Sequence, residues 1–210
     1  MIAFRSLERF AKRARRAREG ERCEICGVPI EGAHRHVVDR TDRRLLCACS
    51  MCTLAFDVDN PGRFRTVPER VRGSISEGPA ADALAALGVP VGLVFFMKTR
   101  ASGHWLAVFP SPAGATEAEI DDGAWTAFAA TTELARDIQD DVEALLVNRK
   151  RSGSVSCFVV PVDACYELTA RVRKSWRGID GGDAVAVVVD EFFAALAQRS
   201  EPGACRGGMA

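Results

Sequence analysis

Five of the eight cysteines of this 210-residue chain, and two of its three histidines, lie within residues 23–52. Two C-x-x-C pairs, Cys23/Cys26 and Cys49/Cys52, are separated here by twenty-two residues. Such pairs supply four thiolates at the spacing of a tetrahedral structural metal site. The sequence therefore predicts a metal site made by these four cysteines, with zinc as the expected ion and iron as the alternative.

Three further side chains in this stretch offer donor atoms, and the sequence leaves their roles open. Cys47 either replaces Cys49 as a ligand or packs beside the site; we favour Cys49 because its spacing from Cys52 repeats that of the first pair. His34 and His36 lie two residues apart, so on a strand they share one face. They either orient ligands and bond the hairpin, which we favour, or belong to a second metal or acid–base site.

The segments around these residues predict a small module with knuckle, hairpin and helix. Gly27 follows the first cysteine pair and permits a left-handed turn. Residues 34–38 and 43–48 are typical of two short strands around a polar turn, and residues 50–56 can begin a helix that carries Cys52. This order is a treble-clef arrangement. With so few large apolar side chains, the module is expected to need its metal to fold.

The second half of the chain predicts a larger α+β domain built from two ββα repeats. Residues 95–103 align without a gap with residues 145–153, and each copy leads from one apolar strand through a basic turn to another. Each hairpin is followed by helical periodicity, with Asp121 or Asp122 as the first cap and Asp163 as the second. A last helix, capped by Asp183, is expected to bury Val187, Phe192, Phe193 and Leu196.

These patterns divide the chain into four segments. The expected limits are 1–57 for a basic helix (residues 2–18) and the zinc module, 58–88 for a linker with a short helix near 82–87, 89–198 for the α+β domain, and 199–210 for a disordered tail. Polar residues at strand exits either line a ligand or partner site or act as helix caps. They are Ser111, Gly114, Thr116, Glu117, Asn148, Arg149 and residues 176–178.

Composition limits the classes of function. The chain is 48% hydrophobic and 27% charged with a formal net charge of zero, so it is expected to be globular without a global field that attracts nucleic acid. Its apolar runs are short and its N-terminus has no signal core, so a cytoplasmic protein with metal-bound rather than disulfide-bonded cysteines is expected. His104 is the only histidine outside the module, and no common catalytic motif occurs. An enzyme is therefore not favoured.

Eight segments, in order and covering nearly the whole chain, resemble a bacterial family encoded beside uptake NiFe-hydrogenase genes. They are RCEICG, AHRHVVD, LLCACSMC, PVGLVFF, FPSPAGATE, DVEALLVNR, CYELTARVRKSWRG and EFFAAL. The resemblance implies a cytoplasmic accessory protein in hydrogenase assembly, maturation or electron transfer, with a hydrogenase subunit or maturation factor as its partner. It implies no catalytic residue.

The cysteine-rich module also resembles two other kinds of protein. Its C-x-x-C-G, His-rich hairpin and R-x-L-L-C pattern is similar to the zinc-stapled endonuclease VII relatives of the HNH nucleases, but Ala33 and Arg35 stand where acidic residues are expected and Thr53 follows Cys52. A shared scaffold is therefore favoured over shared nuclease chemistry. Rubredoxin-like carriers hold one iron with four thiolates. Here the second pair lacks the glycine of rubredoxin knuckles, so zinc is preferred.

Overall fold

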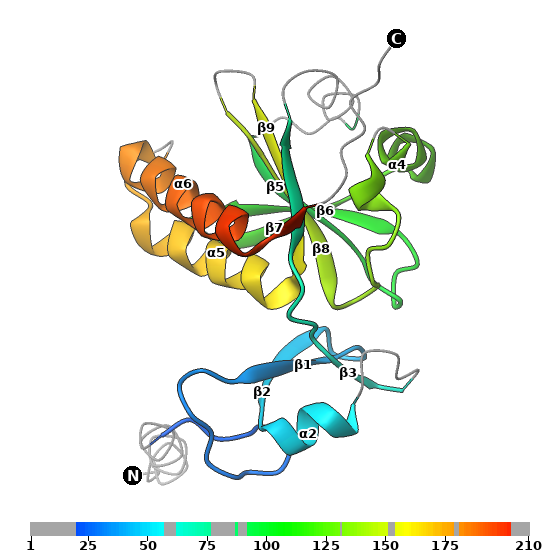
Figure 1. Cartoon of the computed structure of the whole chain (residues 1–210), viewed down its shortest axis with the longest axis vertical. Coiled ribbons are helices and arrows are strands. Elements are labelled where there is room, and N and C mark those ends of the chain that lie inside the picture. The colour runs from blue at the N-terminus through cyan, green and yellow to red at the C-terminus, as the bar shows by residue number, and fades with distance from the viewer. Residues whose placement is uncertain are drawn as a thin grey trace, which may run out of the picture. The chain divides into compact units, whose positions relative to one another are not determined.

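The structure is a computed structural model of the chain, and it describes residues 20–56, 62–76, 87, 92–130, 132–150, 154–178 and 181–202. Two compact units, residues 1–67 and 68–210, make up the chain (Figure 1). The predicted basic helix 2–18, the helix near 82–87 apart from Leu87, and residues 203–210 with Cys205 lie outside the described residues. The domain limits proposed from sequence stay predictions, and each unit is described by itself below.

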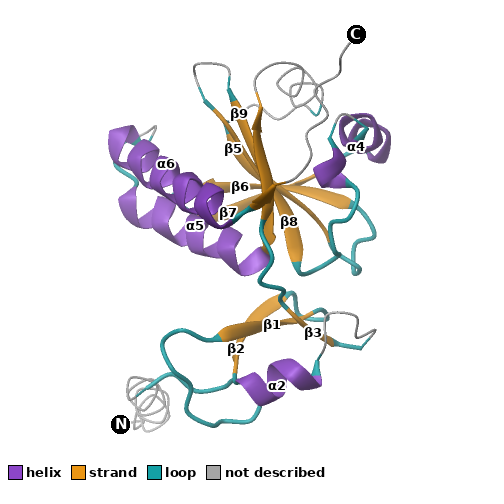
Figure 2. Cartoon of the chain, in the orientation of Figure 1, coloured by secondary structure: helices purple, strands orange, loops and turns teal. Residues whose placement is uncertain are grey.

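The described residues of the small unit form a three-stranded antiparallel sheet and one short helix (Figure 2). Its elements are β1 (Arg35–Asp39), β2 (Arg44–Ala48), α2 (Ser50–Ala55) and β3 (Phe64–Thr66). The sheet order is β2-β1-β3, and β1 and β2 form the predicted hairpin with Asp39 opposite Arg44. In this register the numbers of any two facing residues sum to 83. The position of the turn therefore determines which residues of β1 and β2 face each other.

A buried carboxylate fastens β3 beside this hairpin. Asp39, the last residue of β1, is 4% exposed, and Arg63 donates from Nε to its Oδ1 at 2.9 Å. The backbone N–H of Thr41 donates to the same oxygen at 3.1 Å. The hydrogen bond from Arg63 lowers the pKa of Asp39 and outweighs the opposing effect of burial. The turn of the hairpin is thus held by charge-assisted bonds rather than by apolar packing.

The larger unit is a seven-stranded sheet with helices on both faces (Figures 1 and 2). Its strands are β4 (Arg72–Ser76), β5 (Leu93–Lys98), β6 (Trp105–Ser111), β7 (Gly114–Glu119), β8 (Glu143–Arg149), β9 (Val155–Pro161) and β10 (Glu201–Pro202), in the order β10-β4-β9-β8-β5-β6-β7. Its helices are α4 (Asp122–Ala129), the 3-10 turn η1 (Glu133–Ala135), α5 (Val162–Ser175) and α6 (Gly182–Arg199). Among these described strands, β10 alone pairs in parallel. The predicted α+β class is confirmed.

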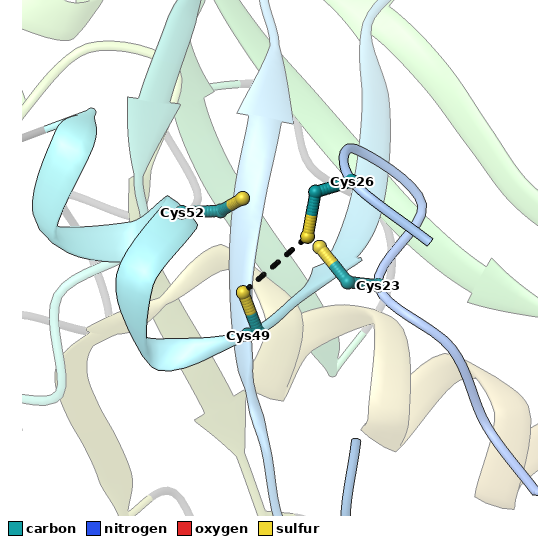
Figure 3. A group of neighbouring side chains, drawn as sticks. All are labelled: Cys23, Cys26, Cys49 and Cys52. Carbon is teal, nitrogen blue, oxygen red and sulfur yellow. Dashed lines mark hydrogen bonds between the residues drawn. The ribbon is translucent and has the colours of Figure 1, made fainter. Parts of the chain in front are cut away.

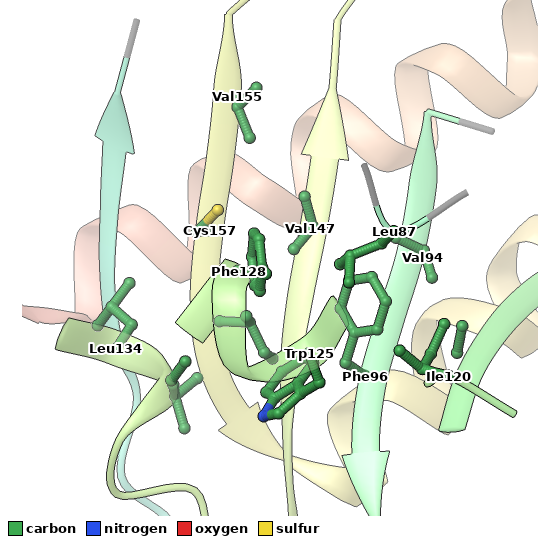
Figure 4. Close-up of a cluster of buried hydrophobic side chains, with 14 residues drawn as sticks. Leu87, Val94, Phe96, Ile120, Trp125, Phe128, Leu134, Val147, Val155 and Cys157 are labelled. Carbon is green, nitrogen blue, oxygen red and sulfur yellow. The ribbon is translucent and has the colours of Figure 1, made fainter. Parts of the chain in front are cut away.

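Side-chain alternation along the central strands builds one core on each face of the sheet. On one face, Trp125 and Phe128 of α4 pack on Phe96, with ring centroids 5.5 and 6.0 Å from it (Figure 4). On the other, Phe158 of β9 meets Phe193 of α6 edge to face at 5.8 Å. The central strands are therefore apolar on both faces, as their continuous hydrophobic runs indicate.

The two predicted hairpins are present, each followed by a helix, but the first carries an additional strand. β5 and β6 precede β7 and α4, whereas β8 and β9 lead directly into α5. Residues 114–119, expected to line a site or cap a helix, instead pair with β6 as an edge strand. The connection is a two-residue turn between Ser111 and Gly114, and Gly114 has a φ of +118° that a glycine adopts without strain.

In the first strands of the repeat, β5 and β8, equivalent residues lie on opposite faces of the sheet. Phe95 pairs with Leu146, so its gapless counterpart Leu145 lies on the opposite face of the sheet. The two hairpin connections also differ by one residue, because Lys98 pairs with Trp105 whereas Arg149 pairs with Val155. The helices that follow the two hairpins, α4 and α5, cover opposite faces of the sheet (Figure 1).

Three details of the helices and tail correct the sequence predictions. Asp163 lies in the first turn of α5 instead of capping it, because Pro161 takes the N-cap position. Val187 is 54% exposed, whereas the other three residues expected in the α6 core are buried. Glu201–Pro202, placed in the predicted disordered tail, pair with β4. Short-range periodicity predicted that the helices exist. It did not predict the residue at which each helix begins, or which residues at the edge of its apolar face are buried.

A first prediction concerns Gly73, which faces Phe158 across β4 and β9. A Cβ built on Gly73 comes within 1.9 Å of Cδ1 of the buried Phe158 ring. Gly73→Ala should therefore destabilise the larger unit by about 1–3 kcal/mol, because overpacking displaces a core ring. Denaturant unfolding gives the value. In a Phe158→Leu background the same change should cost clearly less; equal costs in both backgrounds would show that the ring is not the cause.

Candidate metal centre

The first cysteine pair lies in a knuckle that the backbone itself shapes. The N–H of Cys23 donates to the carbonyl of Val28, and the N–H of Gly27 donates to the carbonyl of Cys23, both at 2.9 Å. Gly27 has a φ of +80°, the left-handed conformation expected from the sequence. The turn leaves the thiol of Cys23 buried and that of Cys26 exposed.

The second cysteine pair lies at the start of α2. Cys49 is the N-cap residue and accepts from the N–H of Thr53 at 3.0 Å, and Cys52 follows in the first turn of the helix. The buried Thr66 of β3 donates from Oγ1 to the carbonyl of Thr53 at 2.7 Å. This bond holds the helix against the sheet, so the sheet fixes where the second pair lies.

The four sulfur atoms converge on one point between the knuckle and α2 (Figure 3). All lie within 4.8 Å of one another, and the sulfur atoms of Cys26 and Cys49 are 3.7 Å apart. A tetrahedron with zinc–sulfur bonds of about 2.3 Å has edges of about 3.8 Å, whereas a disulfide bond measures about 2.05 Å. The cluster therefore has the donors and the spacing to hold one metal ion.

The thiols of the cluster differ in acidity because their surroundings differ. Burial raises the pKa of Cys23, but backbone N–H groups of Cys26, Cys49 and Ile25 more than offset it and bring the pKa to about 6. Burial, followed by hydrogen bonds that its own thiol donates to the neighbouring sulfur atoms, raises the pKa of Cys52 to about 12. One thiolate forms readily and opposes ionisation of its neighbours. A bound cation removes that opposition.

The structure places Cys47 outside the group of four. Its sulfur instead falls within 4.8 Å of ring nitrogens of His34 and His36. Burial, followed by the charges of Glu24 and Glu21, raises the pKa of Cys47. The sequence signal that joins these three residues is the hairpin register, which sets His36 opposite Cys47. The individual residues were identified from sequence, but their grouping was not.

Glu24 is a positioning residue that sequence reasoning missed. Its backbone N–H donates to the carbonyl of Cys47 at 2.8 Å, and its Oε2 accepts from the N–H of Cys47 at 2.8 Å. Arg44 lies 3.6 Å from the other carboxylate oxygen. Glu24 thus joins the first knuckle to β2, and so holds both cysteine pairs in one frame. Its place between two cysteines of a C-x-x-C pair was the available clue.

Polar residues expected to line a site in the larger unit are mostly dispersed. A pocket of about 410 Å³ on this unit includes only Gly114 of that set, beside Tyr166, Thr169, Ala170, Arg173 and Lys174 of α5. His104, the histidine outside the small unit, lies on the surface with its Nδ1 3.7 Å from Asp122. No arrangement of nucleophile, base and orienting group was found among the described residues.

The fold and site together define an α+β protein in which a four-cysteine cluster that could hold a metal precedes a sheet-rich unit. The model of a family of unknown function, DUF5947, matches residues 22–200, and the chain belongs to this family. No curated protein and no solved structure matches the chain. Within the described residues, no helix is both long and apolar enough to cross a membrane.

A second prediction separates the roles of the clustered thiols. Cys49→Ser should release the metal held by the four cysteines and broaden the amide spectrum of residues 20–67, because the ligand set then lacks one thiolate. Metal analysis and a ¹H–¹⁵N correlation spectrum measure both effects. Cys157→Ala, which removes a buried thiol from the larger unit, is the control and should keep its metal. An unchanged metal content in Cys49→Ser would exclude Cys49 as a ligand.

Proposed function

We propose that the chain is a zinc-binding, non-enzymatic accessory protein of a NiFe hydrogenase, acting in the cytoplasm through contacts with a hydrogenase subunit or maturation factor. The observation that carries the metal-binding part is the convergence of four cysteine sulfurs within 4.8 Å. The hydrogenase part is supported by the resemblance of eight sequence segments to a family encoded beside hydrogenase genes. The cluster serves in this proposal as a structural staple, in a treble-clef arrangement.

A structural role for the cluster is supported by the core around it. The fully buried apolar residues of this core are Cys23, Val37 and Ala48, and half-buried Ile25, Ile30, Phe56 and Phe64 pack around them together with Cys49 and Cys52. Three buried residues of modest size supply little hydrophobic free energy, at roughly 1.5–3 kcal/mol for a large side chain and less for alanine. A bound structural zinc contributes about 10–16 kcal/mol. The cluster is therefore placed to stabilise the unit that contains it.

Zinc is favoured over iron by the second cysteine pair. Cys52 lies within helix α2 and is followed by the buried Thr53, whose side chain bonds Ser50 at 2.8 Å. Rubredoxin knuckles instead have a glycine after the cysteine, as Gly27 stands after Cys26 here. One knuckle and one helix start are typical of structural zinc. A rubredoxin-like electron carrier remains the alternative that metal analysis decides.

Nuclease activity is disfavoured by the residues around the hairpin histidines. Ala33 and Arg35 flank His34 and offer no carboxylate for a hard divalent cation. The group that does form around these histidines contains the thiol of Cys47, a soft donor. Magnesium-dependent DNA cleavage that is lost in His36→Ala would support the nuclease alternative; the proposal expects no cleavage by either protein.

A third prediction concerns the identity of the tightly bound metal. Purified protein washed with a weak chelator should keep close to one zinc per chain and be colourless, because zinc has no visible d–d absorption. Elemental analysis and a visible spectrum measure this. Removal by a strong chelator at low pH should unfold the small unit and leave the larger one folded. A red protein with stoichiometric iron would replace this proposal with the electron carrier.

A fourth prediction concerns the hydrogenase partner. The tagged full-length chain should co-purify with a hydrogenase subunit or a maturation factor, and deletion of its gene should lower hydrogenase activity in cells. Restoring the wild-type gene should recover activity, and restoring Cys49→Ser should not. A metal-replete protein with normal hydrogenase activity in the deletion strain would reject the accessory role while leaving the metal site intact.

A further inference from the structure

The hairpin of the small unit gathers a second set of donor atoms on one face. His36 of β1 pairs directly with Cys47 of β2. Directly opposed residues have Cβ atoms about 4.5–5.5 Å apart. His34 precedes His36 by two residues, so its side chain projects from the same face. Backbone pairing thus sets one imidazole beside the thiol, and His34, the residue before β1, adds the second.

This face is not the one that meets the four-cysteine cluster. Val37 and Ala48, the neighbours of His36 and Cys47 along their strands, belong to the small core that contains Cys23, Cys49 and Cys52. Because side chains alternate along a strand, His36 and Cys47 project from the other side. The two sets of donors therefore lie on opposite faces of one hairpin and share no residue.

The donor atoms are close enough for one ion. A ring nitrogen of each histidine and the sulfur of Cys47 all lie within 4.8 Å of one another, and all three residues are half-buried. The two imidazole rings meet edge to face with centroids 5.0 Å apart. Bond lengths of about 2.0–2.1 Å to nitrogen and 2.3 Å to sulfur place ligand atoms of one zinc within about 4 Å of each other. Small side-chain adjustments close that difference.

His34 shows the bonding pattern of a metal ligand. Its side chain is 10% exposed, and its Nδ1 lies 2.9 Å from the carbonyl oxygen of Glu31 and 3.2 Å from a carboxylate oxygen of Glu21. Both oxygens only accept, so Nδ1–H is the donor to them, and in the neutral ring the lone pair is then on Nε2. That Nε2 is buried and has no hydrogen-bond partner within the described part of the chain. A ligating histidine commonly donates its other N–H to a carbonyl or carboxylate in this way.

We propose that His34, His36 and Cys47 form a second metal site, separate from the four-cysteine cluster, that binds a borderline transition-metal ion such as Zn²⁺. Two imidazoles and a thiolate suit such an ion and exclude Mg²⁺ and Ca²⁺, which take oxygen ligands. Three protein ligands leave a fourth position for water or a further ligand, as in open zinc sites. An ion in this second site is therefore expected to exchange with solution more readily than an ion enclosed by the four cysteine thiolates.

Glu24 supports the geometry of this second site from the first knuckle. Its carboxylate accepts a hydrogen bond from the backbone N–H of Cys47 at 2.8 Å, and its own backbone N–H donates to the carbonyl of Cys47. The backbone of the thiol ligand is thus fixed before metal arrives, while the carboxylate remains engaged with the backbone. The site requires a folded hairpin but does not rest on the hydrogenase role.

The test counts metal in the full-length protein. With excess Zn²⁺ followed by gel filtration, wild type should hold two ions per chain, and Cys47→Ala and His34→Ala should each hold one. His104→Ala, which alters the histidine outside the hairpin, is the matched control and should hold two. A ¹H–¹⁵N spectrum of each variant establishes that residues 20–67 remain folded around the retained ion.

Cobalt gives a readout that identifies the ligands. Co²⁺ added to protein with one tightly bound zinc should produce d–d absorption and a thiolate-to-cobalt charge-transfer band, and Cys47→Ala should lose that band. Added Zn²⁺ should also slow alkylation of Cys47 in wild type, a result that needs no variant.

Three outcomes would overturn a separate second site. They are one zinc per chain in wild type, the absence of a thiolate-to-cobalt band, and the loss of both ions together in Cys47→Ala and His34→Ala. If Cys49→Ser loses only the ion of the four-cysteine cluster, that result tests the structural metal site of the proposed function and leaves the second site intact.

Discussion

The confinement of four thiols to one small volume is the constraint around which the small unit is arranged. Cys23, Cys49 and Cys52 belong to the core between its sheet and helix, and Cys26 completes the group of four sulfur atoms. Without a cation, ionising one thiol opposes the next, as the divergent acidities of Cys23 and Cys52 illustrate. A cation bound by all four would remove this opposition, and its binding free energy would then stabilise the folded unit.

The larger unit neutralises a buried carboxylate with its own side chains and backbone. Glu143, at the start of β8, is fully buried, and Arg70 donates to both of its carboxylate oxygens at 2.6 and 2.8 Å. The N–H of Gln139 donates to the second oxygen at 2.9 Å. Because this buried carboxylate has a partner of opposite sign and a backbone donor, the chain's own residues neutralise it and no bound cation is required beside it.

Sequence patterns predicted the elements well where a local rule determines them. The C-x-x-C spacing, the helix cap at Asp121 and the apolar runs of β5 and β9 each act over a few residues, so periodicity and turn chemistry suffice. Grouping Cys47 with the histidines required the pairing register, and β7 was missed because only backbone bonds to β6 make its polar residues a strand. The repeat misled for a related reason: the register in which β5 pairs with β8 sets the faces of these two strands, and a gapless alignment does not show that register.

The ends of the large sheet bear on how this protein can meet another. At one end β10 is two residues long and includes Pro202, which has no backbone N–H to offer. At the other, β7 carries Glu117 and Glu119 along an exposed edge. Short, proline-containing or charged edges discourage strand addition and aggregation. A partner of this unit is therefore expected to recognise side chains on its helices or loops, rather than to extend its sheet with a strand of its own.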